Sequence, residues 1–230
     1  MMANPQPRIA LFHALRESQV PAWKAFADGW PGAKIFNLLD DSLSADLAVA
    51  DGLTPNMTER FLTLGRYVAG TDPDGQRTAA ILFTCSAFGP AIDAVKRDLA
   101  IPVLRPNEAA FEAALDIGGR IALMTTFPKS LPPLVDELRA MAAARGLKPE
   151  IVTTVAEGGL EALQAGNGPE HDHMAATAAA ALPPVDVLVL CQFSLARAAG
   201  AIAPVAGRTV LTTPASAVAK LRTLLGARLR

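Results

Sequence analysis

Two cysteines, Cys85 and Cys191, are the side chains of this sequence best suited to chemistry, and they are its only two. Each closes an apolar run and is followed by small or polar residues that are typical of a helix start. A thiol at a helix N-terminus is favoured as the thiolate, and the free N–H groups of the same terminus can bind a carboxylate. The pattern therefore predicts a reactive sulfur beside an anionic substrate.

Two other roles are open for these cysteines. A cysteine that closes an apolar strand is often only a small buried hydrophobic residue. A Cys-His nucleophile pair is the second alternative, and only His13, just past the first predicted strand, lies where a histidine could reach the same crevice. The return of the cysteine in the second half of the chain favours a functional role for the pair.

The elements that must position the thiols are predicted from apolar runs with helical segments between them. The runs predict strands at residues 8–12, 33–37, 79–84, 102–104, 120–123, 150–154, 187–190 and 209–213. Because every connection is helical, the sheets should be parallel. Ligands of such sheets bind beyond the carboxyl ends of the strands, which is where both cysteines are expected.

An internal duplication organises these elements. Arg120-Ile121-Ala122-Leu123 repeats Arg8-Ile9-Ala10-Leu11, and the intervals to the cysteine and to the next Val-Leu are similar in both halves. The prediction is an α/β fold of two similar lobes related by a pseudo-twofold duplication, each a four-stranded parallel sheet flanked by helices. The first lobe comprises residues 1–104 plus 211–230 and the second residues 105–210, because the helices after residues 106 and 214 follow equivalent strands and should each cross to the other half.

If the two halves face each other, the cysteines also face each other, and the active site lies in the cleft between the lobes. A substrate carbon must fit between the sulfurs, so we expect no disulfide, which needs Cα atoms within about 7 Å.

At these residues the sequence resembles the aspartate/glutamate/hydantoin racemase superfamily, whose relatives include arylmalonate decarboxylases and maleate isomerases. The resemblance lies in the doubled β/α plan, in Thr84-Cys85-Ser86 and in the strand-end Cys191. It implies racemisation without pyridoxal phosphate, other cofactor or metal, with Cys85 and Cys191 as thiolate base and thiol acid on opposite faces of the substrate Cα.

The same resemblance implies which residues bind the substrate carboxylate: Ser86, Ala87 and Gln192 beside the cysteines, with Thr125 and Thr126 from the second half. Many racemases of the superfamily have threonine after the second cysteine, where this chain has Gln192-Phe193-Ser194. The second-half pocket should therefore have a different shape. Relatives with a single cysteine decarboxylate or isomerise instead.

Polar residues after the second strand are further candidates. Asp40 and Asp41, followed by Ser42, come where a parallel sheet presents ligand-facing groups. A carboxylate pair there could hold a substrate ammonium group or His13, so Asp41, Ser42 and His13 are predicted to bind substrate. Capping of the following segment is an equally weighted alternative.

Composition limits the partners. Lys+Arg 21 against Asp+Glu 22 gives a formal charge of −1 and 5% of residues are aromatic, which disfavours nucleic acid. No signal peptide or membrane span is predicted, and two cysteines in 230 residues suit the cytoplasm. His171-Asp172-His173 is better explained as a solvated first helical turn than as a metal site. The oligomeric state stays open, with a homo-oligomer among the alternatives.

Three functions follow from these patterns. The first is a two-thiol racemase or epimerase that acts at the carbon α to the carboxylate of a small acid, such as an aspartate- or glutamate-like amino acid, or on a hydantoin. The second is a one-thiol decarboxylase or cis-trans isomerase of a small carboxylic or dicarboxylic acid. The third is a protein that binds a small ligand without turnover.

Overall fold

The computed structural model describes residues 6–50, 52–70 and 75–228. The chain divides into two compact units: unit 1 comprises Met1–Pro106 with Ala217–Arg230, and unit 2 comprises Asn107–Ser216. Each unit contains one four-stranded sheet in which all strands are parallel. The predicted α/β class with two parallel sheets is therefore confirmed.

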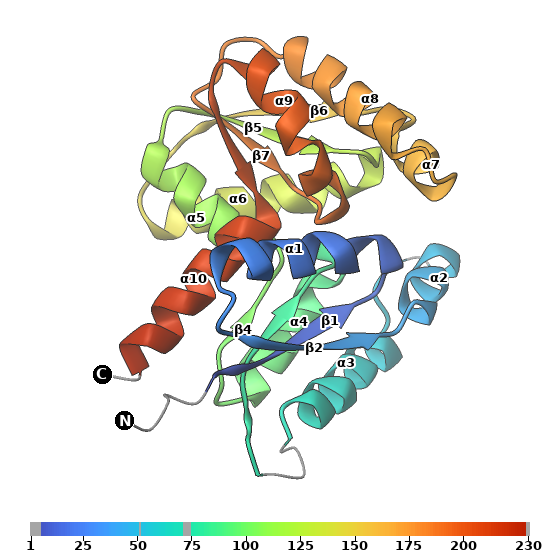
Figure 1. The fold of residues 1–230 in the computed structure, drawn as a ribbon, viewed down its shortest axis with the longest axis vertical. Coiled ribbons are helices and arrows are strands. Elements are labelled where there is room, and N and C mark those ends of the chain that lie inside the picture. Colours follow the sequence, from blue (N-terminus) through green and yellow to red (C-terminus); the bar gives the residue numbers. More distant parts are fainter. Residues whose placement is uncertain (1–5, 51, 71–74, 229–230) are drawn as a thin grey trace. The chain divides into compact units, whose positions relative to one another are not determined.

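The sheet of unit 1 has the order β2-β1-β3-β4 (Figure 1). Its strands are β1 (Arg8–His13), β2 (Lys34–Leu39), β3 (Thr78–Phe83) and β4 (Val103–Leu104). The elements between and after them are η1 (Arg16–Ser18), α1 (Gln19–Gly29), α2 (Ser42–Val49), α3 (Pro55–Val68), η2 (Ser86–Phe88), α4 (Gly89–Asp98) and α10 (Thr213–Arg228), which belongs to unit 1 from Ala217 on.

The sheet of unit 2 repeats this plan with the order β6-β5-β7-β8. Its strands are β5 (Arg120–Thr125), β6 (Glu150–Val155), β7 (Val187–Leu190) and β8 (Thr209–Thr212). Its helices are α5 (Glu108–Ile117), η3 (Pro128–Ser130), α6 (Leu131–Ala144), α7 (Gly159–Gln164), α8 (Gly168–Ala180), η4 (Ser194–Ala198) and α9 (Ala199–Ala206).

The pairing register is also repeated. Arg8 pairs with Lys34 at the start of β1 and β2, and Arg120 pairs with Glu150 at the start of β5 and β6. The two Arg-Ile-Ala-Leu segments thus begin β1 and β5, which occupy the same position in the two sheet orders. This shared register allows residues of the paired strands in one unit to be matched with their counterparts in the other.

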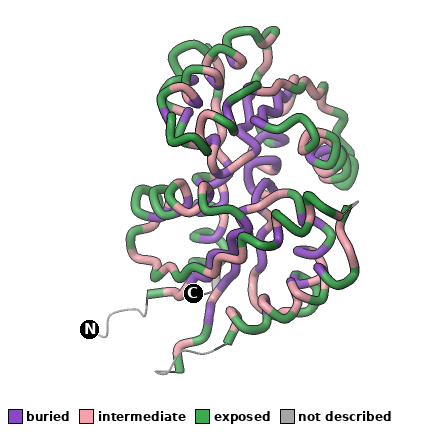
Figure 2. Tube along the Cα trace, turned by 90° about the vertical axis from the view of Figure 1, so that its right-hand side faces the viewer, coloured by how far each residue is buried: buried purple, intermediate pink, exposed green. Residues whose placement is uncertain are grey.

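The buried residues of each unit are concentrated in the central strands of its sheet (Figure 2). The central strands β1, β3, β5 and β7 are almost fully buried, whereas the edge strands β2 and β6 contain only half-buried and exposed residues. Strands that are covered by helices on both faces bury both sets of side chains, so their sequences are continuous apolar runs. This is why the central strands are easy to find in the sequence.

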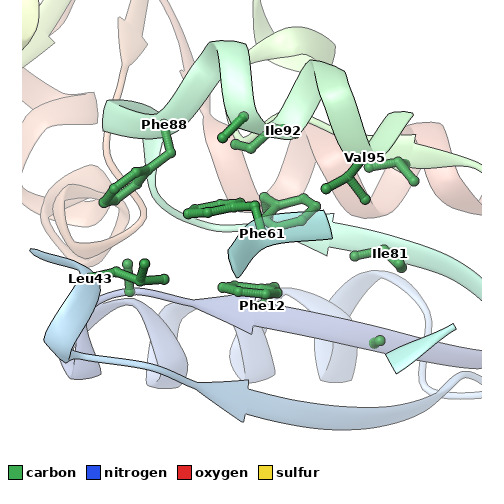
Figure 3. Close-up of a cluster of buried hydrophobic side chains, with 12 residues drawn as sticks. Phe12, Leu43, Phe61, Ile81, Phe88, Ile92 and Val95 are labelled. Carbon is green, nitrogen blue, oxygen red and sulfur yellow. The ribbon is translucent and has the colours of Figure 1, made fainter. Parts of the chain in front are cut away.

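One face of the unit 1 sheet carries an aromatic core (Figure 3). Phe12 from β1 and Phe88 from η2 both contact Phe61 of α3, with ring centroids 5.2 Å and 4.9 Å away. Ile92 and Val95 of α4 complete the cluster. Helices α3 and α4 therefore cover this face, and the rings at its end support the turn that follows β3.

The other face of the unit 1 sheet is covered by α1 and α10. Val218 of α10 lies against Gly29 at the end of α1, where an added Cβ would be 3.1 Å from the valine Cγ1. The Arg222 guanidinium donates a hydrogen bond of 3.1 Å to the Gly29 carbonyl. The last helix of the chain is thus a structural part of unit 1.

Helix α2 begins at Ser42, directly after the two acidic residues that follow β2. It is only eight residues long and buries Leu43 alone, so it has no apolar stripe that repeats over several turns. Helix α3 begins at Pro55, with the Thr54 hydroxyl accepting the Met57 N–H at 3.3 Å.

No helix among the described residues is long and apolar enough to cross a membrane.

Candidate functional site

Cys85 lies directly after β3, where the strand becomes a helix. Its extended backbone (φ −118°, ψ 122°) places it at the N-cap of η2, which leads into α4 with Pro90 in the first turn. The side chain is half-buried against the aromatic core of α3 and α4. The side chain is therefore held at a helix start by its apolar neighbours.

Two effects oppose each other at the Cys85 sulfur. Burial raises the pKa of the Cys85 thiol above its ordinary value, and the Ala87 backbone N–H hydrogen-bonded to the sulfur lowers this pKa in part. Burial is the larger effect, so the pKa of the Cys85 thiol is raised overall. The preference for the thiolate that the helix start is expected to give Cys85 stays a prediction.

Ser86 and Ala87 are the first residues of η2, half-buried and exposed respectively. They adjoin the sulfur along the chain, as predicted for groups that bind a carboxylate. Their binding role stays a prediction.

His13 forms a buried polar network inside unit 1 and has no exposed surface. Its Nε2 lies 3.0 Å from Asn37 Oδ1, which also accepts the Trp23 indole N–H at 2.8 Å. This oxygen can only accept, so Nε2 carries the proton. Nδ1 is then an acceptor, 2.9 Å from the Thr84 hydroxyl and 3.0 Å from the Ser18 hydroxyl.

This network changes the role expected for His13. Desolvation by burial lowers the pKa of His13, which favours the neutral ring. Both ring nitrogens are engaged by protein groups, so a direct contact of His13 with substrate is not the arrangement observed. Sequence reasoning missed Ser18, Asn37 and Thr84, because nothing local in the sequence marks a polar residue as the partner of a buried histidine.

The acidic residues after β2 are bound to arginines. Asp40 is 2.6 Å from the Arg60 guanidinium and accepts the Ser42 hydroxyl at 2.7 Å. Asp41 accepts two N–H bonds from Arg16, at 2.9 and 2.6 Å. The predicted contact of this carboxylate pair with His13 is wrong, and Asp41 stands at the N-cap of α2 without a side-chain capping bond. Substrate binding by Asp41 and Ser42 stays untested.

The two cysteines do not occupy equivalent positions, which corrects the sequence prediction. Phe12 pairs with Phe83 in unit 1, and its counterpart Met124 pairs with Leu190 in unit 2. The next N–H groups continue this match: Thr84 donates to the Phe12 carbonyl at 3.0 Å, and Cys191 donates to the Met124 carbonyl at 2.9 Å. Thr84 is therefore the counterpart of Cys191, and the counterpart of Cys85 is Gln192.

A shift of one residue along a strand turns a side chain to the opposite face of the sheet. Cys85 belongs to the face of α3 and α4, together with Ala10 and Phe12 of β1. Their counterparts Ala122 and Met124 lie on the face of α8 and α9. Cys191 lies instead in the core under α5 and α6.

The surroundings of Cys191 are those of a core residue. The side chain is 1% exposed, and its thiol donates to the Val189 carbonyl at 3.4 Å. Burial raises the pKa of Cys191 far above its ordinary value, and the negative charge of Glu137 on α6 adds to this rise. Both effects oppose a thiolate at this position.

Gln192 is half-buried and held by one residue. Its Oε1 accepts the Thr126 backbone N–H at 2.7 Å and the Thr126 hydroxyl at 2.8 Å. Because the backbone N–H can only donate, the facing atom is the oxygen, and the amide Nε2 points away. The neighbouring Thr125 is fully buried and donates to the Phe127 carbonyl at 3.2 Å. Of the two predicted threonines, only Thr126 is joined to Gln192.

His171 is fully buried, so the expected solvated turn is wrong for this residue. Its Nδ1 lies 2.9 Å from Asp172, which also forms two bonds with Arg197, at 2.8 and 3.1 Å. Asp172 is thus bound on both sides by protein groups. The described residues contain no group of three His, Cys, Asp or Glu that could hold a metal ion.

Comparison with known proteins finds one matching family model and several solved structures with a similar fold. The family model described as Asp/Glu/Hydantoin racemase matches residues 68–221. No curated protein sequence matches the chain.

Several solved structures share the fold. Glutamate racemase isoform RacE1 from Bacillus anthracis is 12% identical over 98% of this chain and 84% of its own, with a TM-score of 0.71. Allantoin racemase from Pseudomonas fluorescens is 17% identical over 96% of this chain and 92% of its own, with a TM-score of 0.69. The Gly74Cys mutant of arylmalonate decarboxylase is 18% identical over 96% of this chain and 94% of its own, with a TM-score of 0.64.

Proposed function

Because the chain belongs to the Asp/Glu/hydantoin racemase family, we propose that it is a racemase/isomerase-type enzyme that acts at the carbon α to the carboxylate of a small acid. The observation that carries this proposal is Cys85, a half-buried thiol at the end of β3 and the start of η2. The substrate is proposed to lie beyond the carboxyl ends of the strands of unit 1, where Cys85 stands. No pyridoxal phosphate or metal is needed for this chemistry.

The proposed reaction is proton transfer at carbon. The Cys85 thiolate takes the α-proton, the C–H electron pair stays on the carbon, and the negative charge spreads into the substrate carboxylate. The N–H groups at the start of η2, with Ser86, would bind the carboxylate as its charge grows. Because the pKa of Cys85 is raised, the thiol also serves in the opposite direction, as a proton donor to a carbanion.

The family and this site support a proposal for the substrate class. We propose a small carboxylic acid, such as an aspartate- or glutamate-like amino acid, or a hydantoin. The proposed setting is the cytoplasm, where thiols stay reduced. Assembly into a homo-oligomer stays a prediction.

Two forms of this chemistry remain, and one observation favours the second. In the two-thiol form Cys191 is the partner of Cys85 and the enzyme racemises its substrate. In the one-thiol form Cys85 works alone, and the reaction is decarboxylation or cis-trans isomerisation. The register that matches Cys191 with Thr84 favours the one-thiol form.

Incubation in deuterated water tests the reaction class. Candidate amino acids, hydantoins and malonates are followed by NMR and by chiral chromatography, with Cys85→Ala as the comparison. We expect exchange of the α-hydrogen, loss of CO₂ or an isomer with the native protein, and a loss of at least about a hundredfold with the variant. If Cys85→Ala kept full activity while folded, the proposal would be wrong. A protein that bound these acids without turning them over would be the non-catalytic alternative.

A further inference from the structure

Arg105 is a charged residue at the edge of the unit 1 sheet where Cys85 also lies. It is the first residue after β4, and β4 pairs with β3, the strand that leads to Cys85. Because the two strands are parallel, their carboxyl ends meet at one edge of the sheet, which is where ligands of such sheets bind. Both residues belong to unit 1. A thiol and a guanidinium therefore follow adjacent strands of one compact unit.

The Arg105 guanidinium lies against the helix start that follows Cys85. Gly89 ends the single turn of η2 and begins α4. A Cβ added at Gly89 would be 3.1 Å from Arg105 Cζ and would collide with one of the terminal guanidinium nitrogens. A 3₁₀ helix rises about 2 Å per residue, which places Gly89 about 8 Å along the chain from Cys85. One small acid can therefore extend from the sulfur to the guanidinium.

A purely structural role explains this placement poorly. Arg105 Nε is 3.5 Å from Asp93 Oδ1, and the two side chains are 22% and 38% exposed. A long ion pair at a partly exposed position adds little to stability. The dipole of α4 also opposes a cation beside its first turn, because the N-terminal end of a helix carries positive partial charge. A bound anion would remove this repulsion.

The guanidinium is better placed to act on a ligand than on the sulfur. The pKa of Cys85 is set by burial, which raises it, and by the Ala87 N–H, which lowers it in part. Neither effect comes from Arg105. An arginine that does not act on the thiol can still bind a charged group of the acid that the thiol attacks.

We infer that Arg105 determines substrate specificity in unit 1, because its guanidinium binds an anionic group of the substrate remote from the reacting carbon. This inference rests on the proposed function, since it takes Cys85 as the reacting thiol. The N–H groups at the start of η2 bind the carboxylate beside the reacting carbon, and Arg105 binds the second anionic group. Two parallel N–H bonds from a guanidinium to a carboxylate fix the orientation of the acid. The preferred substrate is therefore a small acid with two carboxylates.

Succinate and butyrate are matched probes of this specificity. They share a four-carbon chain and differ in one carboxylate. Isothermal titration calorimetry with the full chain gives a Kd for each acid without the need for turnover. With the native chain we expect succinate to bind more tightly, and the ratio of the two Kd values measures recognition of the second carboxylate.

Three variants test the contact that Arg105 is inferred to make. Arg105→Gln should lower the preference for succinate by about tenfold, the effect of one lost hydrogen bond between charged groups, and should leave the Kd of butyrate unchanged. Arg105→Lys keeps the charge without the planar fork of donors, so it should retain part of the preference. Gly89→Ala changes no charge but puts a methyl group where the guanidinium lies, so it should also lower the preference.

The matched control is Arg97→Gln, which removes an exposed arginine in the last turn of the same helix. It changes the net charge by the same amount as Arg105→Gln and should leave the ratio of Kd values unchanged. Far-ultraviolet circular dichroism shows whether each variant is folded, and Gly89→Ala carries the test if Arg105→Gln is not.

The outcomes separate the inference from the proposed function. If neither acid binds the native chain, the proposed function loses its acid site and the inference falls with it. If butyrate binds and succinate binds no more tightly, the inference fails and the proposed function stands. The same holds if a folded Arg105→Gln variant keeps the preference. An equal loss in Arg97→Gln would also overturn the inference, because net charge alone would then explain the preference.

Discussion

At the scale of single residues, the polar groups of unit 1 are arranged to keep one histidine neutral. His13 is enclosed by Asn37, Ser18 and Thr84, and Thr84 is the residue before Cys85. The network thus fixes the backbone at the point where β3 delivers the thiol. Its effect on Cys85 is one of positioning, because both ring nitrogens are already occupied.

The lowered pKa of His13 predicts a pH dependence of stability. The folded state resists protonation of the ring, whereas the unfolded chain binds a proton near its ordinary pKa of 6.5. The unfolded state therefore holds more protons as the pH falls below about 6.5, and this residue makes folding less favourable by up to about 1.4 kcal/mol per pH unit until the folded pKa is reached. Above this range the contribution is constant.

Urea unfolding between pH 8 and pH 5, followed by tryptophan fluorescence, measures this effect. Both tryptophans, Trp23 and Trp30, lie in unit 1, so the signal reports on the unit that contains His13. His13→Asn should be less stable at pH 8 but should lose less stability on acidification than the native chain. The control is His173→Asn, an exposed histidine of unit 2. Equal slopes for the native chain and His13→Asn would contradict this account.

At the scale of elements, close packing between α3 and α4 sets the position of the helix that follows Cys85. Gly65 of α3 lies against Val95 of α4, and an added Cβ would be 2.7 Å from one valine methyl carbon. Valine has a stiff χ1, so it cannot move aside at little cost. The glycine allows the two helices to approach.

This contact predicts that one substitution has opposite effects in two backgrounds. Gly65→Ala should destabilise the native chain by about 1–2 kcal/mol, because overpacking outweighs the gain in helix propensity. In a Val95→Ala background the same change should be stabilising by up to about 1 kcal/mol, since the space is then open. Chemical denaturation of the four proteins in this cycle measures both values. A stabilising effect in the native background would show that the helices are further apart than described.

The elements of this fold were largely predictable, and the exceptions have physical causes. Continuous apolar runs mark β1, β3, β5 and β7, because these strands are buried on both faces. Helix α2 was missed because its single buried leucine gives no periodic signal. The position of Cys85 at a strand end was predictable for the same reason as the strand itself.

The offset of one residue between the two cysteines was not predictable from local pattern. In both halves an apolar run ends near a cysteine, but the run alone does not show which backbone groups still pair with the neighbouring strand. The strands have a side-chain period of two, so an offset of one residue moves a side chain from one face to the other. Only the pairing of Thr84 with Phe12 and of Cys191 with Met124 reveals this offset.

At the scale of the whole molecule, two helices belong to a different unit from the strand that precedes them in the chain. Helix α5 follows β4 of unit 1 but belongs to unit 2, and α10 follows β8 of unit 2 but from Ala217 belongs to unit 1. Leu221 of α10 is fully buried there, whereas Leu224 on the same helix is 36% exposed.

Helix α10 should therefore be required for the stability of unit 1. Leu221→Ala should cost about 2–5 kcal/mol by opening a cavity. Leu224→Ala is the matched control and should change stability by less than about 0.5 kcal/mol. A chain that ends at Ser216 should show unfolded tryptophan emission while the far-ultraviolet spectrum keeps the signal of unit 2. Undiminished stability of the truncated chain would show that α10 does not belong to the core of unit 1.

The exchange of α5 and α10 has a consequence for the origin of the repeat. A chain of half this length would contain four strands and a final helix that does not cover its own sheet. Two copies could each complete the other by donating that helix, so the smallest stable form would be a symmetric dimer. One polypeptide that contains both halves carries both donated helices, which leaves each half free to change independently. Cys85 in one half and Gln192 in the other are such a divergence.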